Sequence, residues 1–147
     1  MLGAGLASGC SRYTDHVEGT TEPRIVVMVR LGREMAPVVP MVLDTGAPWN
    51  VLQPELVEVM ECAPERLDMP RRLLIRGIWY DGQLARAQYS LIAMVGSPLV
   101  IEGLFFIPDA GQQGLESLPN FLGYRGCIER CIIAIDPAEG VVCFGEA

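Results

Sequence analysis

The stretch MVLDTGA, residues 41–47, ends an apolar run in an acid, a small hydroxyl residue and a glycine. Asp, Thr and Gly all disfavour strands, so a strand that contains Val42 and Leu43 is expected to end at Asp44 in a tight turn. The Asp44 carboxylate then lies at the mouth of an apolar segment. A carboxylate in that position is suited to general acid–base catalysis.

The same stretch resembles the active-site motif of the retropepsin-like (retroviral-type) aspartic proteases, in which two apolar residues precede Asp-Thr-Gly-Ala. A second stretch, FLG at residues 121–123, is similar to that family's other signature, which leads into a short helix. The resemblance extends over residues 24–145 and indicates a bacterial-type single-domain member. Asp-Thr-Gly alone is also an ordinary strand-ending turn, but its apolar flanks and the later FLG stretch favour a catalytic role.

The chain length bears on how such a site is completed. A chain of 147 residues fits one compact domain, and it contains one Asp-Thr-Gly run. Pepsin-like enzymes carry two such turns in one longer chain. Since the chemistry needs two carboxylates, the resemblance implies a symmetric homodimer with one Asp44 from each copy at the two-fold axis.

The resemblance assigns a role to each residue of the two motifs. Asp44 is the catalytic residue, and the supporting residues are Thr45, Gly46, Ala47, Leu122 and Gly123. The Thr45 hydroxyl is expected to bond across the axis to the partner's backbone. Gly123 is expected to lie beneath the catalytic turn, where two backbones approach too closely for a Cβ atom.

Asp81-Gly82 is a strong hairpin signal between two β-rich runs, residues 73–80 and 84–95. The hairpin falls where the family keeps its flap, the β-hairpin that closes over bound peptide. The predicted flap and substrate residues are Gly77, Ile78, Trp79, Tyr80, Asp81 and Gly82. The two glycines are expected to give a mobile tip, and the two aromatic side chains either contact substrate or pack on the domain surface.

The predicted fold is all-β: a small closed barrel of the acid-protease type with one short C-terminal helix, forming a homodimer. Short apolar runs separated by turn residues favour an all-β architecture. The closed barrel of the acid-protease type, its C-terminal helix and the homodimer are what the resemblance implies. Strands are expected at residues 24–31, 37–43 and 100–107, and a closing hairpin at 132–135 and 141–144. Helices are expected at residues 54–61, where Pro54 occupies a helix-start position, and at 124–131, by resemblance to the family.

Residues 24–147 are interpreted as the retropepsin-like domain, and residues 1–23 as a flexible leader or the remnant of a signal or lipoprotein segment. The run LASGC, residues 6–10, looks like a bacterial lipoprotein cleavage box, but no basic residue or long apolar segment precedes it. Contact with a membrane is expected only if Cys10 is lipidated. The compartment stays open between the cytoplasm and, with a lipidated Cys10, the cell envelope.

The composition limits the classes of partner that the chain is expected to bind. Apolar residues make up 50% and charged residues 20%, which suits a folded domain, and the net charge of −7 gives no electrostatic reason to bind nucleic acid. Cys127 and Cys131 lack further ligands at metal-binding spacing and are predicted to be core residues. No metal or other cofactor is expected, and the expected partners are a peptide or protein substrate and a second copy of the chain.

The leading hypothesis is an aspartic endopeptidase that hydrolyses peptide bonds by general acid–base catalysis, with one Asp44 from each subunit. A non-catalytic retropepsin-fold module for dimerisation or peptide binding is the alternative, and a lipid-anchored structural protein is the third. One departure from the family concerns the dimer. The ion pair that supports it in retroviral enzymes is missing, because Pro48 and Tyr124 occupy the two positions.

Overall fold

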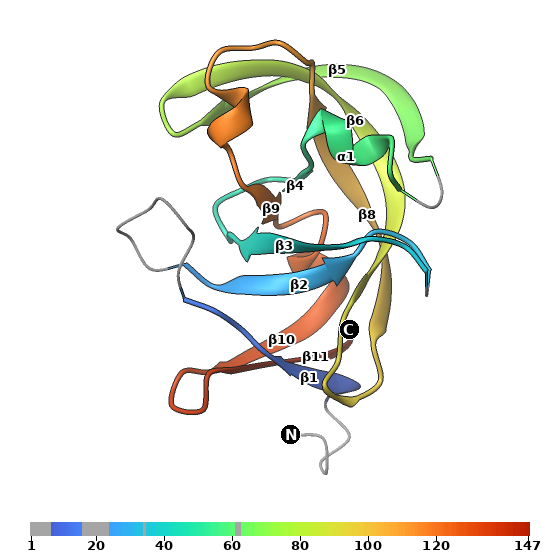
Figure 1. The fold of residues 1–147 in the computed structure, drawn as a ribbon, viewed down its shortest axis with the longest axis vertical. Coiled ribbons are helices and arrows are strands. Elements are labelled where there is room, and N and C mark those ends of the chain that lie inside the picture. The colour runs from blue at the N-terminus through green and yellow to red at the C-terminus, as the bar shows by residue number, and fades with distance from the viewer. Residues whose placement is uncertain (1–6, 16–23, 34, 61–62) are drawn as a thin grey trace.

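The computed structural model describes residues 7–15, 24–33, 35–60 and 63–147 (Figure 1). In this part of the chain the protein is mostly β, with a closed six-stranded barrel and one short α-helix. The predicted all-β barrel is therefore confirmed at the level of fold class.

Six strands close the barrel in the order β2-β3-β9-β4-β8-β6, and β6 also pairs with β2. Their bounds are β2 (Val26–Arg30), β3 (Val38–Leu43), β4 (Asn50–Val51), β6 (Ile78–Leu91), β8 (Leu99–Pro108) and β9 (Asn120–Leu122). The long strands are rich in β-branched and aromatic residues, which suit a half-buried pleated surface. The short β9 comes late in the chain, yet it lies between β3 and β4, the two strands on either side of the MVLDTGA turn.

The strand β5 (Glu65–Ile75) pairs with β6 to form a long hairpin that extends from the barrel (Figure 1). Its two-residue turn is Arg76-Gly77, and both residues have positive φ, 51° and 82°. This backbone matches the right-handed twist of the strands. The hairpin predicted at Asp81-Gly82 is therefore wrong in position, because Asp81 and Gly82 lie within β6. A Cβ atom at Gly82 would overlap the Ile107 carbonyl of β8, so this glycine permits a close approach of two strands.

A second sheet has the strand order β10-β11-β1-β7. It contains β1 (Gly9–Arg12), β7 (Val95–Gly96), β10 (Cys131–Asp136) and β11 (Val141–Glu146), and the hairpin β10–β11 confirms the predicted closing hairpin. The flexible leader predicted for residues 1–23 is wrong for residues 9–12, which pair along their length with β11. Residues 1–6 and 16–23 of that segment lie outside the described residues.

A disulfide joins Cys10 of β1 to Cys143 of β11, which lie opposite each other in the antiparallel pair. The sequence did not predict it: the chain has five cysteines, and an odd number argues against a complete disulfide framework. The bond also bears on the lipoprotein hypothesis. A sulfur atom in a disulfide cannot carry a thioether-linked lipid, so the bond and lipidation of Cys10 exclude each other.

The α-helix α1 (Pro54–Val57) begins at Pro54, as predicted, and ends earlier than predicted; residue 61, its expected end, lies outside the described residues. The C-terminal helix predicted for residues 124–131 is wrong. The chain there forms turns and a single 3₁₀ turn, η3 (Ile128–Arg130), because Cys127 has φ −142° and leaves the helical region. Another 3₁₀ turn, η2 (Leu115–Ser117), follows β8. No helix among the described residues is long and apolar enough to cross a lipid bilayer.

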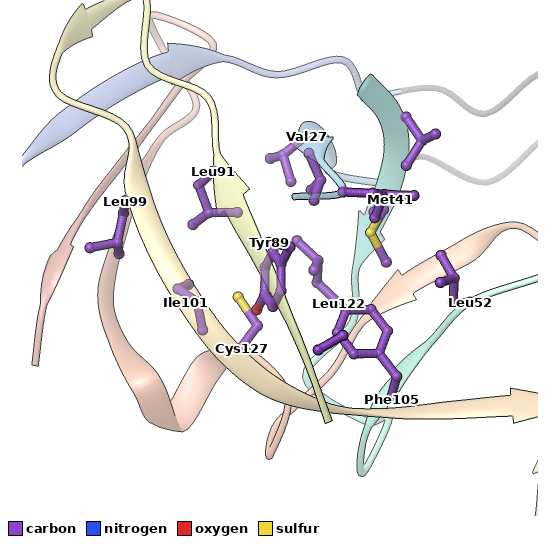
Figure 2. Packing of buried hydrophobic residues seen from close by; sticks show 14 of the residues in the cluster. Val27, Met41, Leu52, Tyr89, Leu91, Leu99, Ile101, Phe105, Leu122 and Cys127 are labelled. Atoms are coloured by element: carbon purple, nitrogen blue, oxygen red, sulfur yellow. The ribbon is translucent and has the colours of Figure 1, made fainter. Parts of the chain in front are cut away.

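Two apolar clusters form the core. The larger joins the barrel to the second sheet, and in it Tyr89 meets Phe105 edge-on at 5.4 Å between ring centroids (Figure 2). Cys127 and Cys131 are buried in this cluster, as predicted for core residues. The smaller cluster lies under the β5–β6 hairpin and includes Tyr80 and Phe121. The strand β9, which pairs with β3 just before Asp44, contributes Leu122 to the larger cluster and Phe121 to the smaller one.

Candidate active site

The Asp44 turn follows directly from the end of β3. Leu43 is the last residue of the strand and pairs with Leu122 of β9. The Asp44 N–H then donates to the Leu122 carbonyl at 2.9 Å, and the Asp44 carbonyl accepts from the Ala47 N–H at 3.2 Å. The carboxylate oxygen Oδ1 accepts a hydrogen bond from the Gly46 N–H at 2.9 Å. One carboxylate oxygen is thus held by the turn, and the acid ends the strand as predicted.

The turn faces outward. Thr45 and Gly46 are exposed, whereas Asp44 and Ala47 are half-buried. Among the described residues the Thr45 hydroxyl has no hydrogen-bond partner within the chain. The structure of the single chain therefore leaves this hydroxyl accessible to another molecule.

Gly123 lies directly against the turn, as the family resemblance implies. A Cβ atom built there would overlap the Trp49 carbonyl and lie 2.7 Å from the Ala47 carbonyl oxygen. The next two residues bond to the same loop: the Tyr124 N–H donates to Ala47 at 2.8 Å and the Arg125 N–H to Pro48 at 2.9 Å. The close approach of two backbones at Gly123 is confirmed, and its physical reason is the absence of a side chain.

Asn50 supports the candidate site and was not predicted from the sequence. It is fully buried at the start of β4. Its Oδ1 accepts from the Gly123 N–H at 2.8 Å, and its Nδ2 donates to the Gly126 carbonyl at 3.2 Å. Tyr89 donates to the same carbonyl at 2.6 Å. Asn disfavours strands, so an Asn that opens a strand shortly after the Asp44 turn was the signal in the sequence.

This network is shielded from water, which affects its titrating groups. Burial raises the pKa of Tyr89 well above its usual value of 10.0, and a neighbouring Cys127 adds to the rise. A hydrogen bond with Cys127, together with burial, raises the pKa of Cys131. Both groups therefore stay protonated at neutral pH and act as packing and hydrogen-bonding groups in the larger core cluster.

A cavity of ≈ 180 Å³ opens beside Asp44. Its walls come from the turn, from Phe121 and Val51, and from the end of β5 and its turn. The residues that line it are Arg24, Asp44, Gly46, Ala47, Pro48, Val51, Leu73, Leu74, Ile75, Arg76 and Phe121. We call this the Asp44 pocket. The hairpin that resembles a flap therefore does reach the predicted catalytic turn, and it does so with β5 and Arg76.

The predicted flap residues differ in their position along the hairpin and in their burial. Gly77 lies in the turn and Ile78 starts β6, so these two are at the hairpin tip. The exposed fraction of Trp79 is 56%, whereas that of Tyr80 is 1% because its ring packs in the smaller cluster.

Asp81 and Gly82 lie further along β6 and do not line the Asp44 pocket. Asp81 forms an ion pair with Arg72 at 3.0 Å. Sequence reasoning missed Arg76 and the three residues before it, because the hairpin turn was placed five residues too late along the chain.

Among the described residues, no group of three or more His, Cys, Asp or Glu side chains is arranged to hold a metal ion. The ionisable groups of the Asp44 pocket are a single carboxylate and two guanidinium groups, those of Asp44, Arg24 and Arg76. Such a set can bind and orient a polar ligand and can move a proton at Asp44. Compared with protein-family models and with curated proteins, the sequence matches none of them.

Proposed function

We propose that this chain is an aspartic endopeptidase of the retropepsin-like type, which hydrolyses peptide bonds with one Asp44 from each of two copies. The observation that supports this most is the crossing at Gly123. The late strand β9 runs between the two strands that flank the Asp44 turn, and Gly123 abuts the turn without a side chain. This arrangement holds the backbone of the half-buried Asp44 in place, and a catalytic group needs such rigid support.

The proposed chemistry needs no covalent intermediate. Two carboxylates held a few ångströms apart do not both ionise readily, so the pair shares one proton. The ionised carboxylate removes a proton from water, and that water attacks the peptide carbonyl. The protonated carboxylate gives its proton to the carbonyl oxygen, so a tetrahedral gem-diol forms. The C–N bond then breaks, the amine takes the proton that was removed from water, and the other carboxylate recovers its proton from the gem-diol. In each copy the Gly46 N–H holds one oxygen of Asp44 in place.

The second copy is expected to dock on the face that carries the turn. Apolar surface is exposed there: Leu74, on the rim of the Asp44 pocket, is 50% exposed, and Tyr124, bonded through its N–H to Ala47, is 51% exposed. The Thr45 hydroxyl is available on the same face. A contact between two such faces brings the two Asp44 side chains together and buries these apolar groups.

The test uses Asp44→Asn in the full chain, with Asp109→Asn as the matched control because Asp109 is exposed and does not line the pocket. On a mixed peptide library at acidic pH, Asp44→Asn should lower kcat/KM by roughly 10³-fold or more, and the control should keep the parent value. A statine-type inhibitor should block the parent, and a chelator should not.

Dilution provides an independent readout. Activity per chain should fall as sedimentation shows the dimer dissociating, because each copy supplies half of the site. Asp44→Asn activity within roughly tenfold of the parent value would overturn the proposal. Peptide binding and dimerisation by a parent that cleaves nothing would instead support the non-catalytic module.

A further inference from the structure

Arg76 combines two features that point to a ligand. It stands in the hairpin turn with φ 51°, so its side chain projects from the tip of β5, and it lines the Asp44 pocket. Its guanidinium carbon Cζ lies over the Phe121 ring, 5.9 Å from the ring centroid. Phe121 belongs to the strand β9 that supports the catalytic turn. Arg76 thus bridges the hairpin tip and the floor of the pocket.

The guanidinium of Arg76 lies over the Phe121 ring, and in the part of the chain that the structure describes its N–H groups donate no side-chain hydrogen bond. Within the described residues Arg76 forms no ion pair with a carboxylate. An Arg edge offers two parallel N–H groups that match the two oxygens of a carboxylate. A cation–π contact with an aromatic ring restricts the guanidinium, so less side-chain entropy is lost when a carboxylate binds.

The charge around the pocket has the opposite sign to that of the whole chain. Two arginines and one aspartate line it, which leaves one net positive charge, whereas the chain carries a net charge of −7. The other walls are mainly apolar, from Val51, Leu73 and Ile75. A pocket with apolar walls and a cation at its rim suits an extended peptide that places an acidic side chain beside an apolar one.

We infer that Arg76 is a specificity-determining residue, which binds a Glu or Asp side chain of the substrate next to the cleaved bond. This inference rests on the proposed peptidase function of the same site. It assigns the substrate class, peptides with an acidic residue beside an apolar cleavage site.

Arg72 supplies a matched control on the same strand. It also lies over an aromatic ring, with its Cζ 5.4 Å from the Trp79 centroid. Its edge is already bonded to Asp81 at 3.0 Å, and it does not line the Asp44 pocket. Arg72→Gln and Arg76→Gln therefore remove the same charge from the same hairpin and differ in access to the pocket.

The experiment uses fluorogenic octapeptides with Leu-Phe at the centre and either Glu or Gln at each of the two positions on either side. The parent should cleave the best Glu peptide with a kcat/KM roughly tenfold above its Gln partner. Arg76→Gln should remove this preference, Arg76→Glu should reverse it, and Arg72→Gln should keep it. Arg76→Asn should behave like Arg76→Gln while suiting the left-handed backbone of the turn, which separates specificity from folding.

Two further readouts report on charge. The preference should shrink with added salt and below about pH 4, where the Glu side chain of the peptide becomes protonated. Equal cleavage of Glu and Gln peptides by the parent, or equal loss of the preference in Arg72→Gln and Arg76→Gln, would overturn the inference and leave the peptidase proposal intact.

A binding measurement tests the role of Arg76 separately from the peptidase proposal. Fluorescence anisotropy of the same peptides, labelled with fluorescein, on Asp44→Asn protein measures recognition without cleavage. A Glu preference that depends on Arg76, with no cleavage by the parent, would support the role of Arg76 and overturn the peptidase function. Peptides that neither bind nor are cleaved would overturn both.

Discussion

At the scale of single residues, the candidate site depends on one position without a side chain and one buried amide. Gly123 lets β9 lie against the loop that follows Asp44, and Asn50 bonds to the Gly123 N–H from the other side. A buried N–H left without a partner is costly, so Asn50 is as specific a requirement as the glycine. Both residues hold the backbone of the turn.

Gly123→Ala should destabilise the fold and abolish activity. The new Cβ atom would overlap the Trp49 carbonyl, and a backbone carbonyl in a loop with several hydrogen bonds cannot move aside without losing them. Urea unfolding should show a loss of about 2–4 kcal/mol.

Gly111→Ala is the control for this change. It meets no atom within 4 Å and carries only the strain of a positive φ, 83°. The free energy of unfolding of Gly111→Ala should fall by only about 1 kcal/mol. Equal losses in Gly111→Ala and Gly123→Ala would contradict the close approach at Gly123.

Because of Tyr89, the free energy of unfolding should fall at alkaline pH. Burial raises its pKa in the folded protein, so the folded state holds the phenolic proton more tightly than the unfolded chain does. This stabilisation is complete below about pH 10, the pKa of a tyrosine in the unfolded chain. It is lost as the pH rises towards the higher pKa of Tyr89 in the folded protein. Between pH 9 and 11 the parent should lose about 1 kcal/mol more than Tyr89→Phe, measured by urea unfolding. Parallel losses in the two proteins would show that Tyr89 titrates normally.

At the scale of elements, the insertion of β9 between β3 and β4 decides where Asp44 points. Leu43 pairs with Leu122, and Val51 pairs with Phe121, so β9 holds the strand before the turn and the strand after it. The β5–β6 hairpin lines the same pocket with the end of β5 and with Arg76. Its turn, Arg76-Gly77, has positive φ at both residues. Turn and hairpin therefore meet through β9 and its Phe121.

Asn50→Ala should loosen this insertion. The Gly123 N–H loses its acceptor, whereas the Gly126 carbonyl keeps Tyr89 as a donor. The free energy of unfolding should fall by about 1–3 kcal/mol, and activity should fall with it. Asn50→Asp keeps the acceptor and loses the donor, so hydrogen exchange at the Gly123 amide should stay slower than in Asn50→Ala. Faster exchange in Asn50→Asp would exclude the proposed role of Oδ1.

At the scale of the whole molecule, the disulfide between Cys10 and Cys143 ties the two ends of the described chain together. It spans 133 residues and fixes β1 beside β11 in the second sheet. Closing so long a loop removes much of the freedom of the unfolded chain. The barrel and the second sheet share the larger core cluster, so this restraint stabilises both.

Cys10→Ser should lower the free energy of unfolding by up to about 5 kcal/mol, by loop-closure entropy. Cys143→Ser should match it, and the double variant should lose no more than either single one, since one bond is removed in each case. A reductant should bring the parent to the level of the variants and leave the variants unchanged. A parent that is indifferent to reductant would show that the bond adds no stability.

Local sequence determined much of this protein, because the relevant physics acts between neighbours in the chain. Poor strand formers end β3 at Asp44, and Pro54 starts α1. The close approach of two backbones at Gly123 was expected only from the resemblance of residues 121–123 to the family's second signature. The all-β class and the closing hairpin followed from the pattern of short apolar runs, whereas closure of the barrel was expected from the family resemblance.

Tertiary structure alone decided which distant groups meet. Asp81-Gly82 has the local signature of a turn, but pairing of β6 with β8 keeps it extended, and the turn forms at Arg76-Gly77 instead. The bonds of Asn50 to Gly123 and Gly126 join residues more than 70 apart in sequence. Cys10 finds Cys143 for the same reason: β1 gains its hydrogen bonds from β11, and no pattern within residues 1–23 encodes that partner.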